Sequence, residues 1–546
     1  MSELKHMRVM IAWLMLLTLA ALGLRLSLIP TRSVVENDGP YYVALAQQLL
    51  RGEWSGALND YWSQLYPVMI AGMALFVQDA ELAARLISAL CGAALVPAVW
   101  WLVNEIADEP SAHLAAILTA FHPWLLASST LTLTEMPFAL FLLLALTAIL
   151  RAGRLGGLRR FALAGGLTGL AILTRSEGML LVLALAGAGL ARLVRARGWS
   201  AAREGLAAAA ALVFIMAPQS IGTYRLYGHL NFMWKSSVGV ALSEAFNRPG
   251  QAEPAIYRLD ENGQPALPQM ASETSFGDYW LRHSNQALGL VGEHARLLWR
   301  DRTAVMLLPD PWTVHATSWW LWLAAAGILK ALTGTKRGAA LAVLGFVTVY
   351  SLGLLSVLVH SRLLIPLIAF SLSFSALGAV GLVQAAGWIV KRIGQPAWQT
   401  AAARALLIPA GAALLYAGSI SYRTTLARID TFMAEPAAEK EAGLWLRANL
   451  PQTENLLSHN PQTPFYFYED WPFERARALP WAPPDEVLAY ADEQQAEYIV
   501  LEEWVIRAAH FPVEPWLDLS ISPPGLRLVK VFGAEPNRVI IYHCIE

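Results

Sequence analysis

Charged residues are scarce in this sequence, and cysteine is nearly absent. Only 15% of the 546 residues are charged, whereas 56% are hydrophobic. Soluble globular chains carry about 25% charged residues, so the composition argues against a soluble enzyme. It also excludes a nucleic-acid binder, and the sequence has neither an internal repeat nor a collagen-like period. Cysteine occurs only at Cys91 and Cys544, which excludes a disulfide scaffold and does not predict a zinc cluster.

Long apolar runs, by contrast, fill the first 420 residues. A bilayer core about 30 Å thick needs roughly 20 mostly apolar residues per helix, a criterion that gives about eleven spans. They are residues 9–29, 81–106, 111–128, 133–151, 160–174, 177–192, 204–221, 314–332, 338–359, 362–389 and 402–420. The first run is long for a cleaved signal and has no clear small-residue cleavage site, so it predicts an uncleaved anchor. The chain is expected to be a polytopic α-helical membrane protein.

The near-neutral net charge of −1 hides a division along the chain. Residues 421–546 hold 10 Lys and Arg against 19 Asp and Glu, so the preceding 420 residues are basic. We therefore expect a membrane domain over 1–420 and an acidic, water-soluble domain over 421–546. The tail mixes a helical pattern with strand-like segments, which indicates a small α/β domain. These segments are residues 441–450 (helix) and 498–501, 527–531 and 539–542 (strands).

Lysine and arginine between the spans predict the orientation, because basic loops resist translocation. Four clusters fall on one side of the predicted topology: Arg151, Arg154, Arg159 and Arg160; Arg192, Arg195, Arg197 and Arg203; Lys330, Lys336 and Arg337; Lys391 and Arg392. With the N-terminus inside, residues 30–80, residues 222–313 and the tail lie outside. An amphipathic stretch over 39–50 predicts an interfacial helix in the first of these loops. Short helices resting on the membrane surface are expected in the second.

Residues 160–192 are too long for one span, since a single helix would run about 48 Å at 1.5 Å per residue. Arginine clusters at both ends must also lie on the same side. A hairpin of two short helices satisfies both constraints. Its tip, residues 174–177, then lies on the outer face.

Four polar sites are expected on that outer face: Asp38, Glu135, the 174–177 tip and the triplet His360-Ser361-Arg362. Ionisable residues at membrane depth usually face a cavity or a partner. A carboxylate can accept the proton of an attacking hydroxyl, while arginines neutralise charge on a departing phosphate. The set therefore suits transfer of a group from a lipid-linked phosphate at the outer surface.

Each site also has a structural interpretation. Asp38 can act as a helix N-cap before Gly39-Pro40, and the helix dipole alone favours Glu135 near a helix start. Arg175 and Glu177 can simply pair with each other, and Arg362 can reach toward the membrane interface. His360, His122 and His229 fit structural or interfacial positions as well as metal ligation. It is the convergence of the sites on one face that favours a function.

The motifs around these residues resemble the GT-C superfamily of lipid-linked-sugar glycosyltransferases. The resemblance covers residues 8–390 and is nearest to bacterial relatives of protein O-mannosyltransferases, such as lipid A aminoarabinose transferase. Its motifs are Asp38 with Tyr41-Tyr42 and the following amphipathic helix, Tyr66-Pro67, the run from Asp79 to Arg85, Thr134-Glu135-Met136-Pro137, Leu173-Thr174-Arg175-Ser176-Glu177-Gly178 and Ser361-Arg362-Leu363-Leu364-Ile365-Pro366. Ser176 stands where the family often has proline.

The resemblance implies a polyprenyl-phosphate sugar as donor, an acceptor outside the cytoplasm and catalysis by Asp38. Glu135 is expected to orient the acceptor or the sugar. The donor phosphate would be bound by Arg175, Arg362 and Arg85, and the substrates by Tyr41, Tyr42, Glu36, Glu177 and His360. Glu36 is also an alternative to Asp38 as the base. The zinc ligands of some members have no assigned equivalent here, so a divalent metal stays open.

The sequence thus predicts an inverting glycosyltransferase in the inner (plasma) membrane, with its active site and C-terminal domain on the extracytoplasmic side. The acceptor is a lipid, a glycan or a protein. One alternative is a transporter or flippase of a lipid-linked envelope precursor, which would carry ionisable residues near the middle of several spans. Another is a membrane anchor whose acidic tail binds a partner; deletion of 421–546 would then abolish its function.

Overall fold

The computed structural model describes residues 2–36, 38–58, 62–196, 199–228, 281, 284–300, 319–357, 361–393, 436–459, 468 and 475–545. The chain divides into two compact units. The first comprises Met1–Thr31, Gln48–Phe232 and His294–Phe432, and the second Arg32–Gln47, Met233–Glu293 and Met433–Glu546. The predicted span over 402–420, most of the 222–313 loop, His229 and His360 lie outside the described residues.

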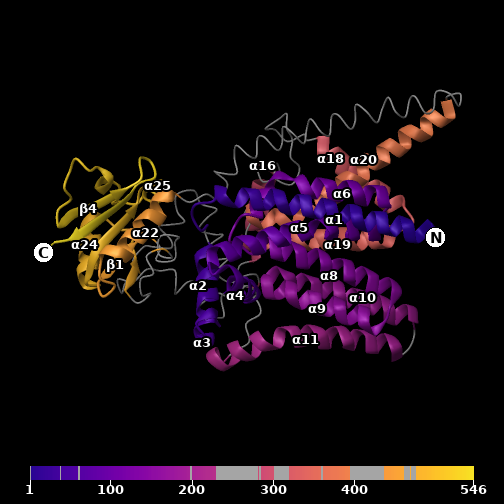
Figure 1. Ribbon diagram of the computed structural model, residues 1–546, viewed down its shortest axis with the longest axis horizontal. Coiled ribbons are helices and arrows are strands. Elements are labelled where there is room, and N and C mark those ends of the chain that lie inside the picture. The colour runs from indigo at the N-terminus through magenta and orange to yellow at the C-terminus, as the bar shows by residue number, and fades with distance from the viewer. Residues whose placement is uncertain are drawn as a thin grey trace. The chain divides into compact units, whose positions relative to one another are not determined.

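The first unit is helical (Figure 1). Its longer helices are α1 (Ser2–Leu28), α4 (Leu65–Val77), α5 (Ala80–Ile106), α6 (Glu109–Phe121), α7 (Pro123–Ser128), α8 (Glu135–Leu155), α9 (Leu158–Thr174), α10 (Leu180–Ala196), α11 (Trp199–Tyr227), α18 (Trp319–Thr333), α19 (Arg337–Val357) and α20 (Ile365–Ile393). Short segments are η1 (Ile29–Thr31), α3 (Trp54–Ala57), η2 (Ser176–Met179) and η3 (Ser361–Leu364). Helices α2 (Gly39–Leu50) and α16 (Ser284–Arg300) contain residues of both units.

Seven of the described helices are long and apolar enough to cross a membrane, which confirms the multi-pass helical fold. The predicted hairpin over 160–192 is also confirmed, because α9 ends at Thr174 and α10 begins at Leu180 after the η2 turn. In addition, the loop predicted over 30–80 contains the apolar helix α4, which packs against α5. Helix α4 is shorter than a full span.

The span predicted over 111–128 is wrong, because two short helices, α6 and α7, replace it. They meet at Pro123, which lacks an amide N–H and disfavours helical backbone in the residue before it. The carbonyl groups at the end of α6 accept hydrogen bonds from another helix. Arg25 of α1, fully buried, donates to the carbonyls of Ala120 at 3.1 Å and Thr119 at 3.4 Å. The break in the helix is thus stabilised by a charged side chain distant in sequence.

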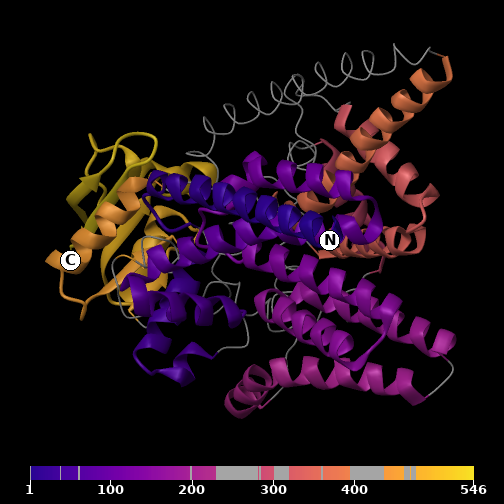
Figure 2. The same cartoon turned by 45° about the vertical axis from the view of Figure 1, so that its right-hand side comes forward.

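Helices α8 to α11 lie side by side in both views (Figure 2). The chain turns from α8 into α9 through Gly156 and Gly157, whose positive φ angles of 68° and 102° suit glycine. Helices α9 and α11 approach so closely that a Cβ at Gly165 would collide with the carbonyl of Ala208. Small residues at such contacts are typical of helix packing in membranes.

One end of this helical unit collects the basic residues that the sequence places on the inner side. Glu105, at the end of α5, pairs with Arg151 at 2.9 Å and Arg154 at 2.6 Å. Lys330 pairs with Asp108 at 2.9 Å. Burial alone would raise the pKa of Asp108, but hydrogen bonds from Ser111, Lys330 and Gln384 and the charge of Lys330 lower it to about 2. The acidic loop after Trp101 is therefore neutralised by the same basic clusters that predict its sidedness.

The second unit contains a five-stranded sheet with the order β2-β1-β3-β5-β4. Strands β1 (Asn455–Ser458), β2 (Ala476–Ala478) and β3 (Ala496–Glu502) are parallel, while β4 (Leu526–Phe532) and β5 (Val539–Cys544) add antiparallel pairs. Helix α22 (Ala437–Asn449) shares a core with one face of the sheet. Helices α24 (Pro484–Glu493) and α25 (Glu503–Ala508) share the other core, next to the short η4 (Glu514–Leu517). The predicted α/β domain is confirmed.

The start of the first loop belongs to this second unit. Val34 and Val35 form a small buried cluster with Tyr468, whose hydroxyl accepts a hydrogen bond from the Val35 amide at 2.9 Å. Lys440 of α22 donates to the Ser33 carbonyl at 3.1 Å and lies 4.7 Å from the centre of the Tyr468 ring. The segment that precedes Asp38 is thus held by side chains of the C-terminal part of the chain.

Candidate active site

Glu135 is the first residue of α8 and is almost fully buried. The N-terminus of a helix stabilises negative charge through its unpaired amides and its dipole, so the carboxylate is favoured at this position. Burial still requires polar partners. Among the residues that the structure describes, Oε2 of Glu135 has no hydrogen-bond partner, whereas Oε1 accepts from an arginine. One oxygen is therefore anchored by an arginine, whereas the other has no such anchor among the described residues.

Arg175, at the break between α9 and α10, is that anchoring arginine. Its Nη1 donates to Oε1 of Glu135 and to Oγ1 of Thr134, both at 3.1 Å. On its other side, Nε and Nη2 donate to Oε1 of Glu177 at 3.1 and 2.8 Å. The guanidinium carbon lies 6.0 Å from the centre of the Phe138 ring. The planar donor fork of arginine thus joins the start of α8 to the hairpin tip.

Arg362 brings a third segment, η3, to the same carboxylate. Its Nε lies 3.9 Å from Oε1 of Glu135, which is a longer and weaker ion pair than the one made by Arg175. The hydroxyl of Tyr350, a buried residue of α19, donates to the carbonyl of Leu363 at 3.4 Å and so fixes the neighbouring backbone. Arg362 and Arg175 keep side-chain exposures of 18% and 14% against 4% for Glu135, so the two arginines are more accessible than the acid that they share.

Arg85 makes different contacts. Its side chain is buried, and it donates to the Thr130 carbonyl at 2.8 Å and to Glu81 at 3.0 Å. Ser88, one turn further along α5, donates weakly to the Leu133 carbonyl at 3.4 Å. Both residues therefore support the buried segment that leads into Glu135. This is the position of a supporting residue rather than of a group open to a phosphate.

Asp38 lies directly before α2 in the second unit and is half-buried. Glu36, the alternative base, is fully buried, and its backbone carbonyl accepts from the Gly39 amide at 2.7 Å. Tyr42 is buried in α2, whereas Tyr41 is partly exposed. Exposure thus favours Asp38 over Glu36 as the acid that meets a substrate. The interfacial helix predicted over 39–50 coincides with α2.

The structure therefore brings together Glu135, Arg175, Glu177 and Arg362, which the sequence places on one face although they are far apart in the chain. The structural interpretation of Arg175 also holds, since it pairs with Glu177 as well as with Glu135. Thr134 belongs to the quoted Thr-Glu-x-Pro motif, but its hydrogen bond to Arg175 is not visible in the sequence. Tyr350 sits in a uniformly apolar run that gives no signal of its contact with η3.

A metal centre was left open by the sequence. Within the described ranges, no group of three or more His, Cys, Asp or Glu side chains is arranged to hold a metal ion.

Residues 64–221 match the family model of dolichyl-phosphate-mannose-protein mannosyltransferases. This segment includes the Thr-Glu-x-Pro start of α8 and the hairpin tip, but neither α2 nor η3. Solved structures of the GT-C fold are similar to this chain over nearly its whole length. The segment 64–221 is therefore similar to this family, and the chain as a whole has the fold of the GT-C structures. None of the curated proteins matches the sequence at a significant level.

Three of the similar structures show how far the likeness extends. An apo oligosaccharyltransferase of Archaeoglobus fulgidus is 14% identical and has a TM-score of 0.60, over 94% of this chain and 73% of that one. The archaeal oligosaccharyltransferase AglB of the same organism, in complex with an inhibitory peptide and a dolichol-phosphate, is 15% identical. Its TM-score is 0.55, over 97% of this chain and 74% of that one. ArnT of Cupriavidus metallidurans bound to undecaprenyl phosphate is 12% identical and has a TM-score of 0.54, over 97% of this chain and 98% of that one. At these identities the likeness establishes the fold alone.

Proposed function

We propose that this protein transfers a sugar from a polyprenyl-phosphate donor to an acceptor on the outer side of the inner (plasma) membrane. The observation that carries the proposal is the convergence of Arg175 and Arg362 on the buried Glu135. Two guanidinium groups held side by side are suited to a phosphate leaving group, whose charge grows as the glycosidic bond breaks. The family model and the fold are those of glycosyltransferases.

Glu135 holds the two arginines through Oε1 and offers Oε2 to a hydroxyl of the sugar or of the acceptor. Arg362 and Arg175, both more exposed than Glu135, contact the phosphate. Asp38 acts as general base and accepts the proton of the acceptor hydroxyl as that oxygen attacks the sugar. Attack opposite the departing phosphate makes the transfer inverting. Arg85 supports the segment before Glu135.

Two neighbours were solved with polyprenyl-type lipids, undecaprenyl phosphate in ArnT and dolichol-phosphate in AglB. That chemistry is consistent with a lipid-phosphate donor for this chain. AglB was also solved with a peptide, and a lipid, a glycan or a protein each remains an acceptor under this proposal. A transporter would carry ionisable residues at mid-span. In the described spans, Glu135, Arg151 and Arg154 lie near helix ends instead, which favours the transferase.

The first experiment identifies the missing sugar. Envelope glycolipids and glycoproteins are compared by mass spectrometry in cells with and without the gene, and one sugar modification is expected to disappear on deletion. An unchanged envelope would contradict the proposed function.

The second experiment tests the base by complementing the deletion. Asp38→Asn is expected to lower transfer about 100-fold or more, because general base catalysis contributes roughly 10²–10⁴-fold. Glu53→Gln, at an exposed acid further along the same segment, is the control and is expected to restore the sugar fully. Full restoration by Asp38→Asn would overturn the assignment of the base, while leaving the function itself intact.

A further inference from the structure

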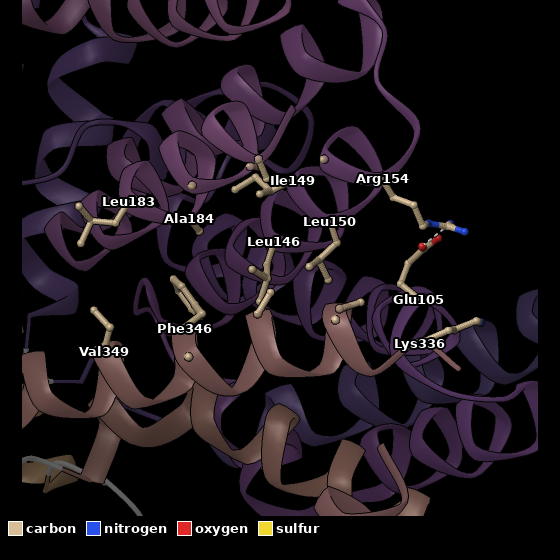
Figure 3. Close-up of a pocket in the computed structure, with 18 of the residues that line it drawn as sticks. Glu105, Leu146, Ile149, Leu150, Arg154, Leu183, Ala184, Lys336, Phe346 and Val349 are labelled. Atoms are coloured by element: carbon tan, nitrogen blue, oxygen red, sulfur yellow. Dashed lines mark hydrogen bonds and ion pairs between the residues drawn. The ribbon is translucent and has the colours of Figure 1, made fainter. Parts of the chain in front are cut away.

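A cavity of about 740 Å³ lies between α8, α10 and α19, away from the site described above. For most of its length its walls are apolar: Leu183 and Ala184 of α10 face Phe346 and Val349 of α19, and Leu146 of α8 lies beside them (Figure 3). Along α10 the lining runs from Leu180 to Arg195, which corresponds to about 22 Å at 1.5 Å per residue. This distance exceeds half the thickness of a bilayer core.

The two ends of this groove differ in chemistry. Arg154, Arg195, Lys336 and Glu105 line the end that coincides with the basic loops. Both carboxylate oxygens of Glu105 are already engaged, one by Arg151 and the other by Arg154. Three cations and one paired carboxylate give this mouth a surplus of positive charge. Arg154 and Arg195 are exposed, so their guanidinium groups are accessible from the membrane surface.

No side chain of the described residues fills the space in front of Gly187 and Gly345, two glycines that line the groove on opposite walls. A Cβ at either residue would meet nothing within 4 Å. Close packing makes such a space costly if it stays empty, because the lining atoms lose their contacts. Inside a bilayer, the available filler is a hydrocarbon chain.

We propose that this groove binds an anionic phospholipid of the leaflet at the basic end, independently of the transfer reaction. Arg154 and Arg195 hold the phosphodiester headgroup, and one acyl chain lies along α10 past Gly187. Basic pockets between membrane helices on the cytoplasmic side are suited to anionic headgroups, and arginine is suited to the planar geometry of phosphate oxygens. The positive-inside tendency alone explains cations on this face. It does not explain an apolar groove that ends between them.

The polyprenyl-phosphate donor fits this groove less well. Its phosphate is expected near Glu135, which begins α8, whereas Arg154 lies in the last turn of the same helix. A donor phosphate held at the mouth of the groove would therefore be a helix length away from the arginines that stabilise its departure. The mouth suits a lipid that stays bound rather than one that reacts.

The test uses the purified full-length protein in detergent and native mass spectrometry. It is incubated with equal amounts of phosphatidylglycerol and phosphatidylcholine that carry the same acyl chains. The wild type is expected to retain phosphatidylglycerol preferentially. Each arginine beside an anionic headgroup strengthens binding roughly fivefold, so Arg154→Gln with Arg195→Gln should lower the preference about 25-fold. The control, Arg159→Gln with Arg203→Gln, removes the same charge at two exposed arginines outside the groove lining.

A second pair of variants tests the acyl chain without altering charge. Gly187→Leu fills the groove, whereas Gly189→Leu adds the same side chain to α10 at a position outside the lining, also with open space around its Cβ. Gly187→Leu is expected to abolish retention of phosphatidylglycerol, and Gly189→Leu to preserve it. The proposal is wrong if the wild type retains both phospholipids equally, or if the control variants lose as much phosphatidylglycerol as the groove variants do. It is also wrong if undecaprenyl phosphate displaces phosphatidylglycerol from the wild type and Gly187→Leu prevents the binding of undecaprenyl phosphate.

Discussion

Few residues define the candidate site, and their burial distinguishes them from other charged residues. Glu135 is nearly inaccessible, yet it is a charged group at a helix start, where the chain could have placed it in water. Its ion pairs with Arg175 and Arg362 explain how the charge is tolerated, because a buried charge needs a paired and hydrogen-bonded environment. The motif around each residue is readable in the sequence. The distances that make them one site depend on three helices packing together, which no local pattern contains.

Arg175 offers a test of geometry as opposed to charge. Arg175→Lys keeps the positive charge but loses the planar fork that joins Thr134, Glu135 and Glu177. Because hydrogen bonds to charged groups contribute about 1.5–3 kcal/mol each, we expect kcat/KM for sugar transfer to fall about 100-fold. Arg159→Lys, at an exposed position at the other end of α9, serves as the control. Equal activity of the two variants would show that only charge matters at Arg175.

A second buried carboxylate, Glu503, predicts how the C-terminal unit responds to acid. Burial alone would raise the pKa of Glu503, but hydrogen bonds from Arg538 and Arg507 outweigh it and hold the pKa below its ordinary value. A lowered pKa in the folded state gives stability above the ordinary value near 4.3 that is lost as pH falls through the folded pKa. Protection of β3 and β5 against hydrogen exchange, corrected for intrinsic rates, is therefore expected to decline below about pH 4.

The matched substitution removes the cause of that shift. Arg538→Met leaves Glu503 buried with one arginine fewer, and loss of a partner in a buried ion pair costs about 3–5 kcal/mol. We expect the exchange protection of β3 and β5 to fall accordingly at neutral pH. Arg527→Met, at an exposed residue of β4, should change little. Similar protection in both variants would contradict the role given to Arg538.

At the scale of helices and strands, the sequence predicts an element well where the evidence for that element lies within the segment itself. The hairpin over 160–192 follows from length and from arginines at both ends, and the α/β unit follows from local apolar periodicity. The break between α6 and α7 was missed although Pro123 marks it, because the surrounding run is continuously apolar. What stabilises the break is Arg25 of another helix, and such a contact is absent from local patterns.

The link between the first loop and the C-terminal unit is another contact of this kind, and it leads to a functional prediction. Tyr468→Phe removes the hydroxyl that accepts from the Val35 amide, three residues before Asp38. A hydrogen bond of this type contributes about 1 kcal/mol. We expect faster hydrogen exchange over residues 33–36 and a loss of sugar transfer of about fivefold in kcat. Tyr490→Phe, at a buried tyrosine of α24, is the control. Unchanged exchange over 33–36 would contradict the link.

For the whole molecule, charge divides the chain more sharply than hydropathy does. Basic residues gather at one end of the helical unit, where Glu105 and Asp108 pair with them, and the candidate site lies at the other end of α8. The net charge of −1 is therefore the sum of a basic membrane part and an acidic tail. The positive-inside rule predicts the orientation of this arrangement in the membrane, and that orientation can be measured directly.

Single cysteines on the two predicted sides provide the measurement. Cys91 is buried in α5, so a background that also carries Cys544→Ser should react little with maleimides. In spheroplasts, a membrane-impermeant maleimide is expected to label Asp485→Cys on α24 at once. Arg159→Cys, next to the basic turn between α8 and α9, should be labelled only after the membrane is permeabilised. The reverse pattern would place the candidate site on the cytoplasmic side, where soluble nucleotide sugars are at hand, and would remove the reason for a lipid-linked donor.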